Sequence, residues 1–148
     1  MDSFNVLKYT TMTQLTTSVI RKRILIVEDD ADECSLMREH LDGHFEIAGF
    51  APNYDGLLRL LQPGQLPQLI LVNLSLPRKN GLEILHELKH NKLYQEIPVI
   101  LISVSFSEYT INKAMEMGAS ACIEKPMVFS DYHRFSAAIY DLIQGAVI

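Results

Sequence analysis

The segment Leu69–Asn73, with the sequence LILVN, restricts the fold of this chain more than any other. Its four apolar residues follow one another without polar alternation, which is the pattern of a β-strand buried on both faces. Pro77 and Gly81 then break the pattern and indicate a structured loop. A polar residue, Asn73, therefore stands at the carboxyl end of a buried strand. In open α/β sheets this is the edge where ligands bind.

Similar apolar runs recur along the chain and alternate with helical patterns. Strands are predicted at 24–27, 45–50, 69–73, 99–103 and 121–123, and helices at 30–41, 53–63, 82–90, 107–118 and 130–143. Helical spacing also assigns Leu58, Ile111, Met115 and Leu142 to the apolar faces of these helices. Five alternations of strand and helix are typical of βαβ units. They predict an α/β fold with a doubly wound, five-stranded parallel sheet covered by helices on both faces.

Composition restricts the functional class. The 148 residues are 48% hydrophobic, enough for one domain with one core, predicted at 23–148 after a Thr- and Ser-rich tail at 1–22. The net charge of -5 argues against nucleic acid as the main partner. No apolar run approaches the roughly 18 residues of a membrane span, and no secretory signal is visible. A cytoplasmic location is therefore expected.

The cysteines and histidines give no clear ligand pattern. Cys34 and Cys122 have neither the number nor the spacing of a disulfide framework or a zinc site, and are expected to be small core residues. The histidines are expected on the surface or half-buried on helices, without ligand spacing: His40, His44, His86, His90 and His133.

Polar side chains follow four of the five predicted strands. Glu28 and Asp29 end the first strand, Asn73 the third, Ser103 the fourth and Lys125 the fifth. Because the carboxyl ends of parallel strands meet at one edge, these side chains are expected to converge. Two carboxylates and an amide oxygen suit Mg²⁺, which prefers oxygen ligands. A lysine and a hydroxyl suit phosphoryl oxygens.

From about Arg23 to Gln144 the chain resembles the receiver domain of response regulators in two-component signalling. The matching motifs are Val-Glu-Asp-Asp after the first strand, Leu-Pro-x-x-x-Gly after the third, a hydroxyl residue ending the fourth, and Gly-Ala followed by Lys-Pro around the fifth. The resemblance implies the flavodoxin-like receiver fold, with strand order 2-1-3-4-5.

The resemblance also implies a site. Family members accept a phosphoryl group on an Asp at the end of the third strand, beside Mg²⁺. Transferred to this chain, the metal ligands would be Glu28 or Asp29, the side chain of Asn73 and the carbonyl of Ser75. The same transfer makes Ser103 and Lys125 the two residues that would contact the phosphoryl group.

Two residues depart from the family pattern. Asn73 occupies the acceptor position, and its amide cannot form an acyl phosphate. Removal of one carboxylate should also weaken Mg²⁺ binding. Asn73 is expected either to keep a metal role or to satisfy nearby backbone groups. Cys122, three residues before Lys125, replaces an aromatic residue that moves inward on activation in the family.

These departures predict a pseudo-receiver that is not an enzyme and acts by protein–protein interaction. The expected partner is a sensor histidine kinase or another signalling protein, bound through the fourth helix, fifth strand and fifth helix; a homodimer is an alternative. No output domain follows, so action in trans is expected. The main alternative is an ordinary phosphoryl-accepting receiver whose acceptor Asp was mutated to Asn. A flavodoxin-like ligand binder is disfavoured, since no Gly-rich loop follows the first strand.

Overall fold

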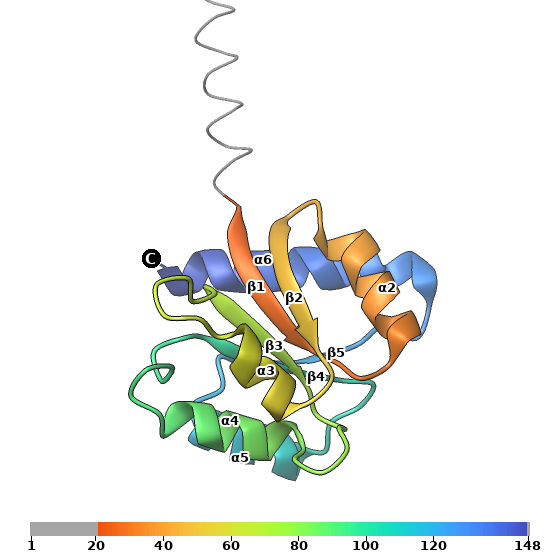
Figure 1. Cartoon of the computed structure of the whole chain (residues 1–148). Coiled ribbons are helices and arrows are strands. Elements are labelled where there is room, and N and C mark those ends of the chain that lie inside the picture. The colour runs from red at the N-terminus through yellow and green to blue at the C-terminus, as the bar shows by residue number, and fades with distance from the viewer. Residues whose placement is uncertain (1–20, 148) are drawn as a thin grey trace, which may run out of the picture.

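The computed structural model describes residues 21–147, which form a parallel sheet between two layers of helices (Figure 1). The strands are β1 (Lys22–Val27), β2 (Phe45–Ala51), β3 (Leu69–Asn73), β4 (Val99–Ser103) and β5 (Ala121–Glu124). The helices are α2 (Ala31–Leu41), α3 (Tyr54–Leu60), α4 (Gly81–Lys89), α5 (Glu108–Glu116), the 3₁₀ turn η1 (Phe129–Asp131) and α6 (Tyr132–Val147). Most of the predicted tail lies outside the described residues, and Lys22 already belongs to β1.

The sheet has the strand order β2-β1-β3-β4-β5, and every neighbouring pair is parallel. This confirms the predicted doubly wound sheet and the order that the family resemblance implied. β3 and β4 are buried along their whole length, as their unbroken apolar runs predicted.

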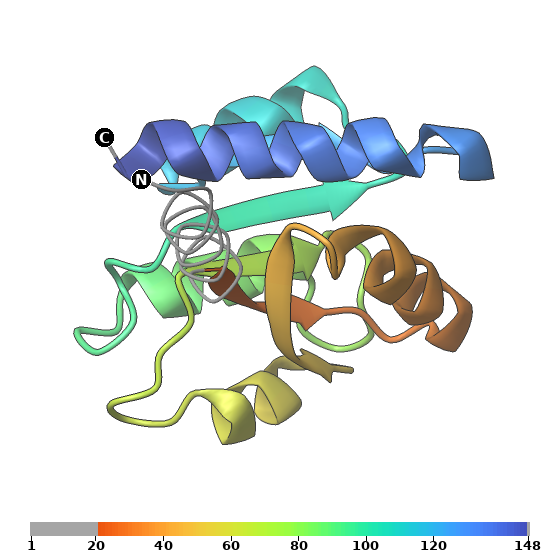
Figure 2. The same ribbon diagram turned by 90° about the horizontal axis from the view of Figure 1, so that it is seen from above.

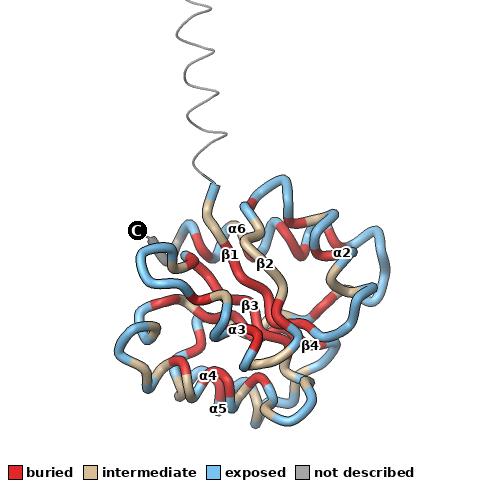
Figure 3. Tube along the Cα trace, in the orientation of Figure 1, coloured by how far each residue is buried: buried red, intermediate tan, exposed pale blue. Residues whose placement is uncertain are grey.

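Strand residues alternate between two cores. On one face, Ile24 and Ile26 pack in a core with residues of α2 and α6. On the other face, Leu25 and Val27 pack in a core with residues of α3, α4 and α5. Figures 1 and 2 show the two helical layers on opposite sides of the sheet, and Figure 3 shows buried residues concentrated in the strands between them. Successive side chains of a strand point to opposite faces of the sheet, so one apolar run contributes residues to both cores.

Side-chain caps begin four of the helices where polar residues follow the strands. Each cap accepts a hydrogen bond from the backbone N–H three residues later; the caps are Asp30, Asn53, Asn80 and Ser107. Gly118, just after α5, has a φ of 103°, a conformation that L side chains rarely adopt. The chain therefore changes direction at the points where the sequence pattern predicts it.

Four residues assigned to apolar helix faces are exposed instead. Leu58 is 37% exposed, Ile111 38%, Leu142 43% and Met115 46%. In α5 only Ala114 is buried, so this helix touches the sheet along a narrower stripe than its apolar residues suggest. Helical spacing identifies the direction of a buried stripe but not its width. Across the described helices, none is long and apolar enough to cross a membrane.

Candidate functional site

Four of the predicted site residues are buried at the carboxyl edge of the sheet. Glu28 is 2% exposed, Ser103 6%, Asn73 7% and Lys125 8%, whereas Asp29 is exposed. Polar side chains of this kind are rarely so buried without partners. The predicted convergence therefore occurs for the side chains that point inward.

Backbone hydrogen bonds continue the sheet by one residue past the strands and so fix these positions. The N–H of Glu28 donates to the carbonyl of Ala51 at 2.9 Å, and the N–H of Lys125 donates to the carbonyl of Ser103 at 2.7 Å. Glu28 and Lys125 thus approach the same point from β1 and from the end of β5, although 97 residues separate them.

The carboxylate of Glu28 is the centre of the site. Asn73 Nδ2 donates to its two oxygens at 3.2 and 3.0 Å, and Lys125 Nζ donates to Oε1 at 3.1 Å. The backbone N–H groups of Asp29 and Asp30 donate to Oε2 at 3.1 and 3.2 Å. A carboxylate has about four lone-pair sites. The capacity of Glu28 to accept hydrogen bonds is therefore filled by the protein itself.

A second acid extends this network outward. Glu33 Oε2 lies 3.9 Å from Lys125 Nζ and accepts a hydrogen bond of 2.9 Å from the hydroxyl of Tyr132. Burial is the main cause of a raised pKa at Tyr132, and the hydrogen bond to Glu33 raises the pKa further. The hydroxyl therefore stays protonated and remains a hydrogen-bond donor. Neither residue was predicted as part of the site. Glu33 has the spacing of a capping acid after Asp30, and nothing in the sequence singles out Tyr132.

The other contacts of the predicted site residues lie at the margin of this network. Asn73 Oδ1 accepts from the N–H of Ser75 at 3.3 Å, so the amide satisfies a nearby backbone group as well as Glu28. The hydroxyl of Ser103 accepts only a long bond of 3.4 Å, from the N–H of Ser105. Asp29 and Ser75 are both exposed.

As arranged, these residues do not fit Mg²⁺. Asn73 turns an N–H group, not an oxygen, toward Glu28, and Lys125 occupies the other side of that carboxylate. In the part of the chain that the structure describes, no three histidine, cysteine or acidic side chains are grouped so that they could hold a metal ion. Weak Mg²⁺ binding at this edge stays a prediction.

Both cysteines are half-buried. Burial raises the pKa of the Cys34 thiol, and the carboxylates of Glu28 and Asp30 add to this; burial alone raises the pKa of Cys122. A raised pKa keeps a thiol protonated and unreactive. Cys122 packs against the core on the α3, α4 and α5 side of the sheet, whereas the Cys34 thiol donates to the carbonyl of Glu28 at 3.6 Å.

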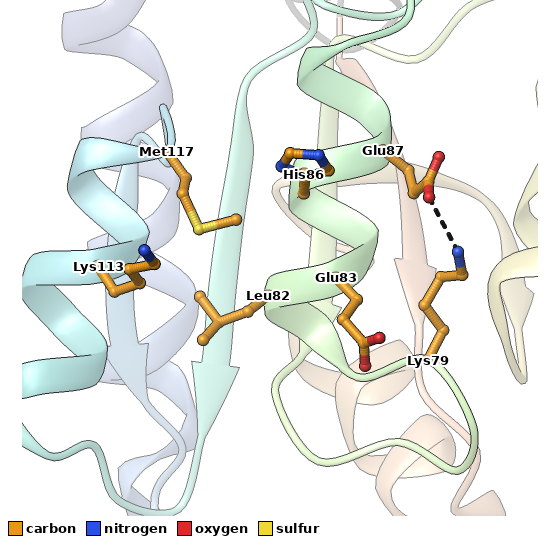
Figure 4. A pocket seen from close by; sticks show the side chains of 7 residues that line it. All are labelled: Lys79, Leu82, Glu83, His86, Glu87, Lys113 and Met117. Atoms are coloured by element: carbon orange, nitrogen blue, oxygen red, sulfur yellow. Dashed lines mark hydrogen bonds and ion pairs between the residues drawn. The ribbon is translucent and has the colours of Figure 1, made fainter.

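A separate pocket of about 300 Å³ lies between α4 and α5 (Figure 4). Its lining is mainly apolar carbon with charged groups at the margin, including the ion pair Lys79–Glu87 at 3.0 Å. The lining residues are Lys79, Leu82, Glu83, His86, Glu87, Lys113 and Met117.

Comparison with known proteins identifies the family. The sequence model of the response regulator receiver domain matches residues 24–135. The chain therefore belongs to the receiver domain family of two-component response regulators, as the fold and the strand-end motifs indicate.

Individual relatives support this assignment. The transcriptional regulatory protein MalR of Bacillus subtilis (strain 168) is 34% identical over 121 residues, which are 80% of this chain and 48% of MalR. The chain thus spans about half the length of that relative. The response regulator Rcp1 of Synechocystis sp. (strain ATCC 27184 / PCC 6803 / Kazusa) is 28% identical over 132 residues, which are 84% of this chain and 85% of Rcp1.

Solved structures give the same result. The phosphorylated cyanobacterial phytochrome response regulator RcpA superimposes with a TM-score of 0.75 at 25% identity, covering 85% of this chain and 96% of RcpA. The Mn²⁺-bound form of Rcp1 gives a TM-score of 0.69 at 28% identity, covering 80% of this chain and 91% of that one.

Proposed function

We propose that this receiver domain signals by protein–protein interaction and takes no phosphoryl group on Asn73. Formation of an acyl phosphate requires a carboxylate as the nucleophile. The nitrogen lone pair of an amide is delocalised into the carbonyl, so Asn73 offers no equivalent nucleophile. Under this proposal the chain is a pseudo-receiver and not an enzyme.

The observation that carries the proposal is the hydrogen bonding of Asn73 Nδ2 to both carboxylate oxygens of Glu28. An aspartate at position 73 could not donate these bonds and would place a second negative charge beside Glu28. With an amide there, Lys125 pairs with Glu28 at 3.1 Å. The carboxylate of Glu28 is therefore paired and hydrogen-bonded without a metal ion or a phosphoryl group.

The same contacts explain why Mg²⁺ should bind weakly. To coordinate a metal, Asn73 would have to turn its oxygen inward, and Glu28 would have to exchange protein donors for the ion. Both changes remove charge-assisted hydrogen bonds from a buried carboxylate, which is costly. We expect Mg²⁺ to bind the wild-type chain more weakly than an Asn73→Asp variant.

The partner that we propose is a sensor histidine kinase or another signalling protein. It would dock on the surface formed by α5, β5 and α6, with a second copy of the chain as the alternative occupant. Exposed apolar side chains on two of these elements support this surface: Tyr109, Ile111 and Met115 on α5, and Leu142 on α6.

Intact-mass spectrometry after treatment with a small phosphodonor and Mg²⁺ tests the proposal. The wild-type chain should gain no phosphoryl group, because position 73 has no nucleophile. The matched Asn73→Asp variant shows whether the rest of the site supports the reaction. A phosphoryl adduct mapped to Asn73 in the wild type would contradict the proposal.

A second candidate function is an ordinary receiver whose acceptor has been replaced by Asn73. The retained Glu28, Ser103 and Lys125 at the carboxyl edge favour it. Stable labelling of Asn73→Asp on the new carboxylate would support this candidate, because the supporting residues would then be competent. Absence of labelling in that variant would show that the site has diverged beyond one residue.

A further inference from the structure

The last residues of helix α4 and its C-cap residue, His90, have the sequence His-Glu-Leu-Lys-His at residues 86–90. Residues four apart lie on the same face of a helix, one turn apart. Two histidines at this spacing are a recognised way to present two imidazoles to one metal ion. The sequence analysis expected no ligand spacing among the histidines, but His86 and His90 are four residues apart.

The two imidazole rings lie next to each other in the structure. Their centroids are 4.0 Å apart, the ring planes differ by 32°, and both residues are exposed. Bonds of about 2.0–2.1 Å from zinc to each imidazole nitrogen would need the two nitrogens roughly 3 Å apart. Rotation about the side-chain bonds would bring one nitrogen of each ring to this separation when an ion binds.

A hydrogen bond fixes the tautomer of His90 in the form that binds metal. Its Nδ1 lies 2.8 Å from the backbone carbonyl of His86. Because a carbonyl can only accept, Nδ1 carries the proton and Nε2 keeps its lone pair. Metal-binding histidines are commonly oriented in this way, through a hydrogen bond at the other ring nitrogen.

Charges of both signs surround His86, because Lys79 and Lys113 line the same pocket. The ammonium of Lys89, which lies between the two histidines in sequence, turns away and donates to the carbonyls of Gln95 and Ile97 at 3.0 and 2.8 Å. The carboxylates of Glu83 and Glu87 project from the same helix, and Figure 4 shows both on α4 with His86.

We propose that His86 and His90 form a binding site for a divalent cation of the Zn²⁺, Cu²⁺ or Ni²⁺ class, with water in the remaining coordination positions. Imidazole nitrogens suit these metals and do not suit Mg²⁺. The site is on α4, separate from Glu28, so this inference does not depend on the function proposed above.

The site binds metal but lacks the parts of a hydrolytic centre. In a metallopeptidase with this motif, the glutamate acts as a base and a third protein ligand completes the zinc site. Here Glu87 is paired with Lys79 at 3.0 Å. Among the described residues no group of three histidine, cysteine or acidic side chains could hold a metal ion.

Zinc affinity of the untagged chain, measured by competition with a chromogenic chelator, tests the proposal. We expect His86→Gln and His90→Gln each to lower the affinity at least about tenfold, the lower range for disturbing a metal site. Excess Mg²⁺ should leave the zinc affinity unchanged. Urea midpoints of the variants would verify that both remain folded, as expected for exposed side chains.

His133→Gln is the matched control. His133 is also exposed, and its Nδ1 lies 2.7 Å from the carbonyl of Ser130, so the same tautomer is fixed without a second histidine one turn away. This variant should bind Zn²⁺ like the wild type. Equal loss in all three variants would mean adventitious imidazole binding only. Unchanged affinity in His86→Gln and His90→Gln would equally overturn the proposal.

Discussion

Two lysine–glutamate pairs in this protein have almost the same length but very different surroundings. Lys125 and Glu28 are 3.1 Å apart with side chains 7% and 1% exposed, whereas Lys79 and Glu87 are 3.0 Å apart with side chains 36% and 44% exposed. A buried charge loses its hydration and depends on its partner. An exposed pair is screened by water and contributes little. Burial, more than distance, should therefore decide what each pair does.

This difference has a functional consequence. The buried pair lies at the carboxyl edge of the sheet, and Asn73 completes the hydrogen bonds of Glu28. Asn73 and Lys125 consequently hold the site in one arrangement, because moving either one would leave the buried carboxylate of Glu28 without a partner. The exposed pair borders the pocket between α4 and α5, where side chains can rearrange at small cost.

The largest effect is expected from Lys125→Met, which would leave the buried charge of Glu28 without a cation. Removal of one partner of a buried ion pair typically costs 3–5 kcal/mol, and we expect a loss of about 3 kcal/mol at neutral pH because Asn73 and two backbone N–H groups remain.

Urea midpoints of the wild type and Lys125→Met at neutral pH measure this loss. If Lys125→Met lowers stability no more than removal of an exposed ion pair would, then burial does not explain the difference between the two pairs.

Asn73→Asp should have the next largest effect. It replaces the donor facing Glu28 by a second carboxylate, and loss of a hydrogen bond to a charged group costs about 2 kcal/mol. Millimolar Mg²⁺ should restore stability in this variant, because two close carboxylates provide the oxygen ligands that the ion prefers. The wild-type midpoint should barely respond to Mg²⁺. An equal response of both proteins would show that Asn73 does not exclude the ion.

Sequence patterns predicted the sheet better than the site. Unbroken apolar runs such as that of Leu69–Asn73 determine which segments are buried on both faces, and the caps Asp30 and Asn53 mark helix starts. The placement of Glu28 and Lys125 followed from the meeting of strand ends, because a parallel sheet brings all such ends to one edge.

The inner contacts of the site could not be predicted in this way. Glu33 has the spacing of a capping acid at the start of α2, but its carboxylate contacts Tyr132 and faces Lys125 instead. Such contacts join α2 and α6 across 99 residues, and no local pattern encodes them. The inward or outward direction of Asp29 likewise depends on the loop, which periodicity does not describe.

Tyr132→Phe tests a hydrogen bond at the outer end of the buried network around Glu28. It removes the hydroxyl that donates to Glu33, and we expect a loss of about 1 kcal/mol, the usual net value of one hydrogen bond. Burial and the bond to Glu33 raise the pKa of Tyr132 above its ordinary value of 10.0. In the unfolded chain the tyrosine ionises near that ordinary value.

The contribution of this hydroxyl should therefore be complete below the ordinary tyrosine pKa and be lost as the pH rises above it. Alkaline unfolding midpoints of the wild type and Tyr132→Phe should converge in this range. Midpoints that stay parallel through the tyrosine titration would show that Glu33 does not hold the hydroxyl.

The smallest effect is expected from Lys79→Met, which breaks the exposed pair of the comparison. Glu87 then keeps its hydration, since water replaces the lost ammonium, and the urea midpoint should not change measurably at moderate salt. The local effect should nevertheless be detectable. Lys79 lowers the pKa of Glu87, mainly through their hydrogen bond and to a smaller extent through its charge. The pKa of Glu87 should therefore be higher in the Lys79→Met variant than in the wild type. Carboxyl NMR shifts of Glu87 measure that change in the folded protein. A large fall in stability for Lys79→Met would mean that the exposed pair stabilises the protein as much as the buried pair does. Burial would then not explain the difference between the two pairs.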